Sequence, residues 1–325
     1  MIKKKRFLMG LILILILIFA GCSNSSQTPT DLQDKKEDNS LKIGVFSIGD
    51  ILPLVVGIEN KYFADNNVQV ELVYFQSAVE KESAFQSGHL DGIVTDMAVA
   101  YLLKEAGVPL KITSITTGVD ASEGRFGVAT APNSGLNSLQ DLKDKKVGVS
   151  LNTIIEYVFD GLLLQEGLAE NYAEKIPVPK IPVRLEMLLS GQLDAAVLPD
   201  PLLAFAEFQG ATIIADDTVG DNLSQVVLLF HDNIVNERTA VLKSFYKAYS
   251  MAVEDINSNR ENYRELFVEK AKVPAPIAEI YIIPSFPQPE VPSEEDVQRI
   301  LNWLQKKDLV KGNIFYKDLV AHGLY

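Results

Sequence analysis

Small polar and acidic residues follow the short apolar runs of this chain, at positions where parallel β-strands would end. In open parallel sheets these strand ends meet helix N-termini, whose free N–H groups and partial positive charge favour polar ligands. The pattern indicates hydrogen bonding to a small molecule. The candidate substrate-binding residues are Ser47, Asp50, Gln76, Ser77, Thr95, Asp96, Asn152, Thr153 and Asp200.

The same residue types also begin helices, so each candidate has a second interpretation. Ser77 and Thr153 stand three residues before a glutamate, which is the spacing of a capping box. Asp96 and Asp200 are suitable N-cap residues for the helices expected after them. A cap can also contact a ligand, and we expect at least half of the set to line one cleft.

The charge of the candidate set bears on the ligand. Asp50, Asp96 and Asp200 are acids, and we expect no basic residue beside them. Such a cleft suits a neutral or cationic ligand with N–H donors, such as an aminopyrimidine or an amine. A nitrate or sulfonate would instead need one of three cations to reach the cleft: Arg184, Arg125 or Lys180. We expect Arg184 to lie on a helix surface. Three aromatic residues could stack on a ligand ring: Tyr74, Phe75 and Tyr157.

These residues must be positioned by alternating strands and helices. Apolar runs at 42–46, 68–75, 92–95 and 109–116 are separated by amphipathic stretches. Runs of this kind predict a mainly parallel sheet covered by helices on both faces, which is an α/β fold.

The pattern occurs twice. The pentad Ser87–Asp91 (Ser-Gly-His-Leu-Asp) matches Ser190–Asp194 (Ser-Gly-Gln-Leu-Asp) 103 positions later, and Lys42–Val45 matches Lys146–Val149 at a spacing of 104. We expect the pentad glycine to end a helix in the left-handed conformation. The leucine should then pack on the sheet, and the aspartate should precede a buried strand. The duplication predicts two similar lobes.

The lobe boundaries follow from this duplication. We expect residues 41–124 to form the first part of lobe 1, residues 125–231 to form lobe 2, and residues 232–325 to return to lobe 1. Two extended crossings, within 117–130 and 217–233, would act as a hinge. The last part should be helical, with a helix beginning near Ser293, and should pack on lobe 1.

The N-terminus combines four cations at 3–6 with an apolar run from Phe7 to Ala20. A helix of this run would be about 21 Å long, shorter than the ~30 Å hydrocarbon core of a membrane. Residues 1–21 therefore look like a secretory signal peptide. The segment ending at Cys22 resembles a bacterial lipobox, which implies lipidation of that cysteine. The polar residues 22–40 would be a flexible tether. The alternative is an uncleaved membrane anchor.

Composition excludes several classes of function. The 325 residues carry a formal net charge of −13, which argues against a nucleic-acid partner and favours a soluble, monomeric body. The single cysteine and three scattered histidines offer no metal-site spacing. Neither a nucleophile elbow nor a phosphate loop is present, so we expect neither an enzyme nor a bound cofactor.

Together these motifs resemble a known family. The matching stretches are Asp50–Leu54, Lys61–Phe63, Ser87–Asp91, Asn133–Leu136, Asp141–Lys143, Lys146–Val147, Ser190–Asp194 and Pro199–Pro201. They are similar to extracytoplasmic solute-binding proteins of ABC importers, in the group that handles nitrate, alkanesulfonates, taurine and thiamine-pyrimidine precursors.

The resemblance implies a type II periplasmic-binding-protein fold, in which two α/β lobes close on a small molecule. It also implies delivery to an ABC permease, with the body held at the outer face of the membrane through Cys22. Two other functions stay open. One is the thiamine-pyrimidine-synthesising enzyme of the same fold, although that relative has a cysteine-rich segment that this chain lacks. The other is an extracytoplasmic sensor.

Overall fold

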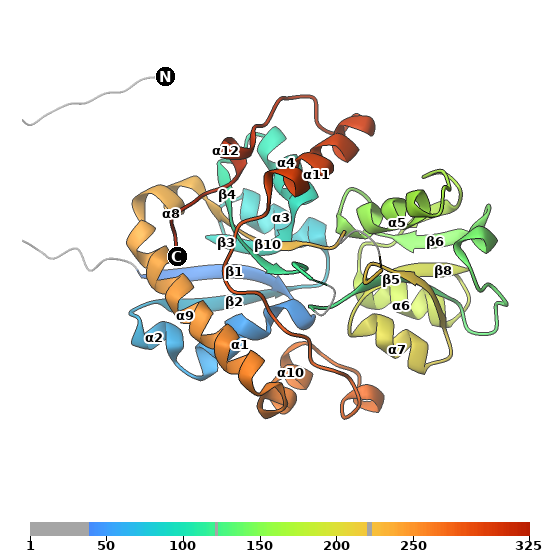
Figure 1. The fold of residues 1–325 in the computed structure, drawn as a ribbon, viewed down its shortest axis with the longest axis horizontal. Helices are drawn as coiled ribbons and strands as arrows, with labels where there is room; N and C mark the ends of the chain where they lie inside the picture. Colours follow the sequence, from blue (N-terminus) through green and yellow to red (C-terminus); the bar gives the residue numbers. More distant parts are fainter. Residues whose placement is uncertain (1–38, 121–122, 220–222) are drawn as a thin grey trace, which may run out of the picture. The chain divides into compact units, whose positions relative to one another are not determined.

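The computed structural model describes residues 39–120, 123–219 and 223–325. The predicted signal peptide, Cys22 and nearly all of the predicted tether lie outside these residues, so the expectations for them stay predictions. The described chain forms two five-stranded sheets with helices on both faces of each (Figure 1). The predicted two-lobed α/β fold is therefore confirmed.

The sheet of lobe 1 has the strand order β2-β1-β3-β10-β4. β1 is parallel to β2 and β3, whereas β10 is antiparallel to β3 and β4. The strands are β1 (Ser40–Phe46), β2 (Gln69–Phe75), β3 (Gly92–Asp96), β4 (Leu110–Thr117) and β10 (Val226–His231). The helices of the first part are α1 (Leu52–Glu59), α2 (Tyr62–Asp65), α3 (Ala78–Gln86) and α4 (Met97–Glu105), with a 3-10 turn at Gly49–Ile51.

The sheet of lobe 2 repeats this order as β7-β6-β8-β5-β9, and β5 is its antiparallel insert. The strands are β5 (Phe126–Thr130), β6 (Lys146–Val149), β7 (Glu174–Pro177), β8 (Ala195–Pro199) and β9 (Thr212–Asp216). The helices are α5 (Ile154–Gln165), α6 (Ile181–Leu189) and α7 (Leu202–Phe208), with a 3-10 turn at Leu139–Leu142.

The repeated pentad has the same local structure in both lobes. Gly88 and Gly191 end their helices with φ of 77° and 71°, in the left-handed region that glycine adopts readily. The pentad leucines are buried. The carboxylates of Asp91 and Asp194 accept hydrogen bonds from the first strand of their own lobes, at 2.7 Å from Lys42 N and 2.8 Å from Lys146 N. The duplication predicted from the sequence is thus a structural one.

The extended run that follows each crossing is the antiparallel strand of a sheet. β5 lies in the sheet of lobe 2, and β10 lies in the sheet of lobe 1. The expected lobe 2 range, 125–231, includes β10. In the structure, however, residues 226–231 are hydrogen-bonded to β3 and β4 of lobe 1. The chain has returned to lobe 1 when β10 begins.

The C-terminal part is helical and covers lobe 1, as expected. Its elements are α8 (Asp232–Glu237), α9 (Thr239–Ser258), α10 (Arg264–Lys270), α11 (Glu294–Lys306) and α12 (Tyr316–Leu319), with 3-10 turns at Arg260–Tyr263 and Ala275–Ile277. α9 packs on α1 and α2, whereas α11 packs on α4. Ser293 caps α11 by accepting a hydrogen bond from Asp296 N at 3.1 Å.

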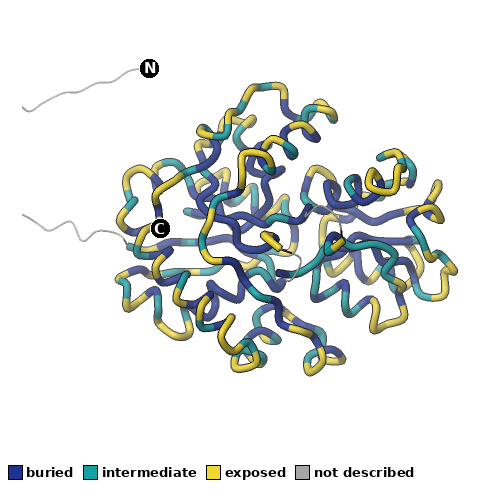
Figure 2. Tube along the Cα trace, in the orientation of Figure 1, coloured by how far each residue is buried: buried dark blue, intermediate teal, exposed yellow. Residues whose placement is uncertain are grey.

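The two sheets are the buried centre of each lobe (Figure 2). One face of the lobe 1 sheet packs on α1, α2, α9 and α10. Its other face packs on α3, α4 and α11 in an apolar cluster that also contains α5 of lobe 2. In lobe 2, α5 packs on one face of the sheet, and α6 and α7 cover the other face. Within the described residues, no helix is both long enough and apolar enough to span a bilayer.

Candidate functional site: a cavity between the two lobes

A cavity of about 50 Å³ lies where the strand ends of the two lobes meet. Its volume exceeds what a single buried water needs, so the cavity can hold a small molecule. Most of its wall is apolar and includes Phe46 at the end of β1 and Phe126 at the start of β5. The charged residues in the wall are Asp50, Lys81 and Asp96 from lobe 1 and Arg184 from lobe 2.

The two cations are equivalent positions of the duplicated unit. Lys81 in α3 and Arg184 in α6 are 103 residues apart, the same spacing as the pentads. Both side chains are fully buried. Each stem passes over a glycine of the first strand of its lobe. A Cβ on Gly44 would lie 3.2 Å from Lys81 Cγ, and one on Gly148 would lie 3.1 Å from Arg184 Cγ. The missing side chains in β1 and β6 therefore leave room for both stems and, at shorter distances, for the pentad leucines Leu90 and Leu193.

Arg184 has little compensation for its charge. Its Nη1 donates one hydrogen bond to Val178 O at 2.7 Å, while Nε and Nη2 are buried without a hydrogen-bond partner. Burial lowers the pKa of Arg184 to about 9, and no neighbouring carboxylate opposes this shift. The expectation that Arg184 lies on a helix surface was wrong, because α6 turns this position towards the sheet and the cavity.

Lys81 has a different environment from Arg184. Its Nζ donates to Val94 O and lies 3.6 Å from the centroid of the Phe46 ring. Burial lowers the pKa of Lys81, and the nearby carboxylates of Asp50 and Asp96 oppose that shift. The expectation that no basic residue stands beside these acids was therefore wrong.

Asp50 presents an acceptor in the wall of lobe 1. Its Oδ1 is buried and has no hydrogen-bond partner, although the residue as a whole is only partly buried. Burial raises the pKa of Asp50 to about 7, against the opposing charge of Lys81. The charge of this carboxyl group near pH 7 therefore depends on the hydrogen-bond donor or cation that binds to it.

Asp96 connects the two lobes. Its Oδ1 accepts from Val99 N at 2.9 Å and caps α4, and its Oδ2 accepts from Ile154 N at 3.1 Å, in the first turn of α5. Burial raises the pKa of Asp96, although these backbone hydrogen bonds oppose the shift. Asp96 is thus both a helix cap and a direct bond across the cleft.

Four of the nine residues expected at the site line this cavity: Asp50, Thr95, Asp96 and Thr153. Thr153 caps α5 by accepting from Ile155 N at 3.3 Å. Ser47, Gln76, Ser77 and Asn152 are not in its wall. Ser77 caps α3, while Gln76 and Asn152 are exposed.

Asp200 lies in a second cavity, of about 30 Å³, between the same two lobes. Its carboxylate pairs with Arg125 Nε at 3.1 Å, and Arg125 also contacts Asp216 and Glu207 at 3.4 Å each. Arg125 is thus neutralised by acids of its own lobe. Lys180, the third cation considered for an anion, is half-exposed and lies 3.5 Å from Glu80 across the cleft.

The aromatic residues in the wall are not those expected. Tyr74 is exposed, and Tyr157 is buried against Trp303. Phe75 packs against the apolar cluster shared by α4 and α5. Lys81, Phe46 and Phe126 line the cavity but were not among the residues expected there. The spacing of 103 residues already relates Lys81 to Arg184, so the repeat could have identified the pair.

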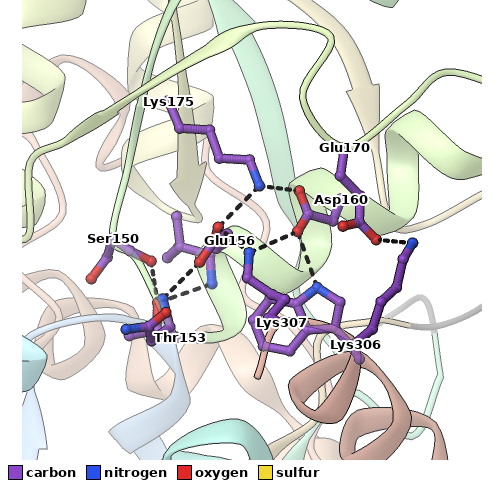
Figure 3. Close-up of polar contacts among 11 residues, drawn as sticks. Ser150, Thr153, Glu156, Asp160, Glu170, Lys175, Lys306 and Lys307 are labelled. Carbon is purple, nitrogen blue, oxygen red and sulfur yellow. Dashed lines mark hydrogen bonds and ion pairs between the residues drawn. The ribbon is translucent and has the colours of Figure 1, made fainter. Parts of the chain in front are cut away.

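A buried ionic cluster holds α5, whose first turn lines the cavity. Glu156 and Asp160 are 3% and 0% exposed, and Lys175 and Lys307 point at both of them (Figure 3). Asp160 Oδ2 also accepts from Trp303 Nε1 at 3.0 Å. Because Trp303 and Lys307 belong to the α11 region, this cluster joins the C-terminal cover of lobe 1 to lobe 2.

Within the described residues, no group of three His, Cys, Asp or Glu side chains could hold a metal ion. The family model for the NMT1-like family matches residues 34–268, which include both sheets and the cavity. The chain belongs to the NMT1-like family. This membership agrees with the group suggested by the sequence motifs.

Solved structures share this family member's fold. A ligand-binding component of an ABC-type import system from Staphylococcus aureus, solved with zinc bound, has a TM-score of 0.73 at 17% identity and covers 88% of this chain and 98% of its own. The alkanesulfonate-binding protein SsuA from Xanthomonas axonopodis pv. citri, bound to MOPS, has a TM-score of 0.74 at 15% identity, covering 88% and 99%. The periplasmic nitrate-binding protein NrtA from Synechocystis has 0.68 at 14%, covering 85% and 83%.

A curated relative bears a different kind of name. A Haemophilus influenzae protein named for thiamine biosynthesis is 26% identical over 162 residues. This chain spans about half the length of that relative, and the match covers 50% of this chain.

Proposed function

We propose that the protein is the solute-binding component of an ABC importer, which captures a small molecule between its lobes and delivers it to a permease. The observation that carries the proposal is the cavity between the lobes, because both lobes supply polar groups to its wall. A ligand that contacts both walls stabilises the closed arrangement, since the open one offers each set separately. The named functions of the structural neighbours support the same role.

The proposal includes the location. Residues 1–21 act as the signal peptide, Cys22 carries the lipid, and residues 22–40 tether a monomeric body outside the membrane. The order of cationic start, short apolar run and cysteine supports this part. Labelling of cells with a clickable palmitate analogue tests it: the wild-type chain should be labelled, and Cys22→Ala should not.

Two ligand classes have support from particular residues. The free Oδ1 of Asp50 favours a ligand with N–H donors, such as a nitrogen heterocycle or an amine. The free Nε and Nη2 of Arg184 favour an anion, such as a sulfonate or nitrate. An enzyme of thiamine-pyrimidine synthesis and an extracytoplasmic sensor are the remaining alternatives, and the name of the Haemophilus relative favours the former.

A thermal-shift screen followed by calorimetry tests the function. We expect a small solute to raise the melting temperature and to bind at one molecule per chain without being converted. Turnover of the bound solute, detected by mass spectrometry, would favour the enzyme. A screen of amines, anions, zwitterions and neutral solutes in which none raises the melting temperature would contradict solute capture.

A further inference from the structure

The wall of the cavity contains one acceptor and one donor pair that have no partner. Among the described residues lining it, only Asp50 and Arg184 have buried side-chain polar atoms without a hydrogen bond. Buried polar groups are nearly always paired, because an unpaired group has lost its hydration without replacement. The two side chains belong to opposite lobes, so any partner that satisfies both must extend across the cleft.

The free atoms of Arg184 have the geometry of a fork. Nε and Nη2 lie along one edge of the planar guanidinium group, while the remaining Nη1 is occupied by Val178 O. Two parallel N–H donors on one edge match the two oxygens of a carboxylate. The neighbourhood of Arg184 supplies no carboxylate, since burial is the only cause of its lowered pKa.

In the wall of lobe 1, one acceptor has no hydrogen bond, although the charge of Asp50 already interacts with that of Lys81. Lys81 is bonded to Val94 O, and the two oxygens of Asp96 accept from Val99 N and Ile154 N. The acceptor that remains is Asp50 Oδ1. A group with N–H donors, above all an ammonium group, fits there, and the apolar wall between the two ends suits a short hydrocarbon spacer.

Resting on the proposed function, we infer that the ligand is a small dipolar molecule, an amino-carboxylic acid, whose carboxylate meets Arg184 of lobe 2 and whose amino group meets Asp50 of lobe 1. The two ligand classes considered separately are then the two ends of one molecule. The cavity volume of about 50 Å³ limits it to a small molecule with a short spacer. Closure of the lobes brings both ends into contact at once, so each end alone should bind weakly.

Calorimetry with matched probes tests this inference on the full-length protein. The probes are unbranched amino-carboxylic acids of two to five carbons, each compared with the amine lacking the carboxyl group and with the carboxylate lacking the amino group. Losing one charge-assisted contact should cost about 100-fold in affinity. At least one amino acid of the series should therefore bind about 100-fold more tightly than both of its halves.

Variants assign the two ends. Arg184→Met should reduce the affinity for the amino acid to that for the matched amine, and Asp50→Asn should reduce it to that for the matched carboxylate. Arg184→Lys keeps the charge but loses the fork, so it should bind the amino acid less tightly than wild type. Lys143→Met, an exposed position in the same lobe, is the control and should leave affinity unchanged.

A folding control keeps the result interpretable. Replacing a buried and poorly satisfied charge by an apolar side chain of similar length is often neutral or stabilising. Arg184→Met should therefore melt at or above the wild-type temperature in the absence of ligand. A clear fall in its melting temperature would make Arg184 a structural residue and overturn the inference.

Other outcomes separate the inference from the function. The inference of a dipolar ligand fails if another kind of solute binds as tightly as every amino acid tested. Such a solute would be an amine, an alkanesulfonate, nitrate or a neutral molecule, and its binding would leave the proposed solute capture intact. Failure of every solute class to bind or to raise the melting temperature would overturn both.

Discussion

Lys307 offers a direct test of the ionic cluster that fixes α5. Its Nζ contacts both buried carboxylates, Glu156 and Asp160, and its side chain is 19% exposed. Lys307→Met would leave Lys175 as the single cation for two buried acids. A hydrogen bond to a charged group contributes about 1.5–3 kcal/mol, and breaking a buried pair costs about 3–5 kcal/mol when no other partner exists.

Because Lys175 remains, we expect a loss of about 2–3 kcal/mol in the free energy of unfolding. At about 1.7 °C per kcal/mol for a body of this size, the melting temperature should fall by roughly 3–5 °C at pH 7 in low salt, measured by circular dichroism. The hydrogen bonds to Glu156 lower its pKa, although burial alone would raise it. A carboxylate whose pKa is lowered by folding stabilises the folded state at pH values above its unfolded pKa. The difference in melting temperature between wild type and Lys307→Met should therefore shrink as the pH falls through the pKa of Glu156.

The neighbouring lysine is the matched control. Lys306 pairs with Glu170 at 2.8 Å, but its side chain is 62% exposed. A surface pair of this kind contributes about 0–1 kcal/mol, so Lys306→Met should lower the melting temperature by less than about 2 °C. Equal shifts for the two variants, or no measurable shift for Lys307→Met, would refute a stabilising role for the cluster.

Two further predictions concern the cavity wall. Asp96→Ala removes both the cap of α4 and the hydrogen bond from Ile154 N across the cleft. It should therefore weaken ligand binding, measured by calorimetry, by far more than the roughly 1 kcal/mol expected for a lost cap. A loss of stability with unchanged affinity would make Asp96 a cap alone. Asp50→Asn should change the pH dependence of urea unfolding. Burial raises the folded-state pKa of Asp50 to about 7 from its ordinary value of 3.8, so this group stabilises the fold at low pH and its contribution is lost as the pH rises to 7. Between pH 5 and 7 the free energy of unfolding of the wild type should fall by about 2–3 kcal/mol through this group, and Asp50→Asn should lack that fall. The same dependence of the unfolding free energy on pH in wild type and variant would contradict this prediction.

The sequence predicted those parts of the site that depend on local order along the chain. A cap and its helix are a few residues apart, so Asp96 and Thr153 could be placed at the starts of α4 and α5. Each pentad is also a local motif, and its repetition 103 positions later predicted the two lobes. These features need no knowledge of how one lobe faces the other.

The features that were missed depend on contacts between distant segments. Whether Arg184 faces solvent or the cavity depends on how α6 packs against β6, where Gly148 makes room for its stem. Ser293 showed where α11 begins, and an amphipathic pattern shows that a helix has a buried side. Neither tells which lobe that side covers, so the contact between Trp303 and Asp160 could not be predicted.

The position of the bound solute tests the central claim most directly. A crystal structure of the protein saturated with a solute that binds in calorimetry should show one molecule between the lobes, in contact with both Asp50 and Arg184. A solute held by one lobe alone, or bound outside this cavity, would contradict the account.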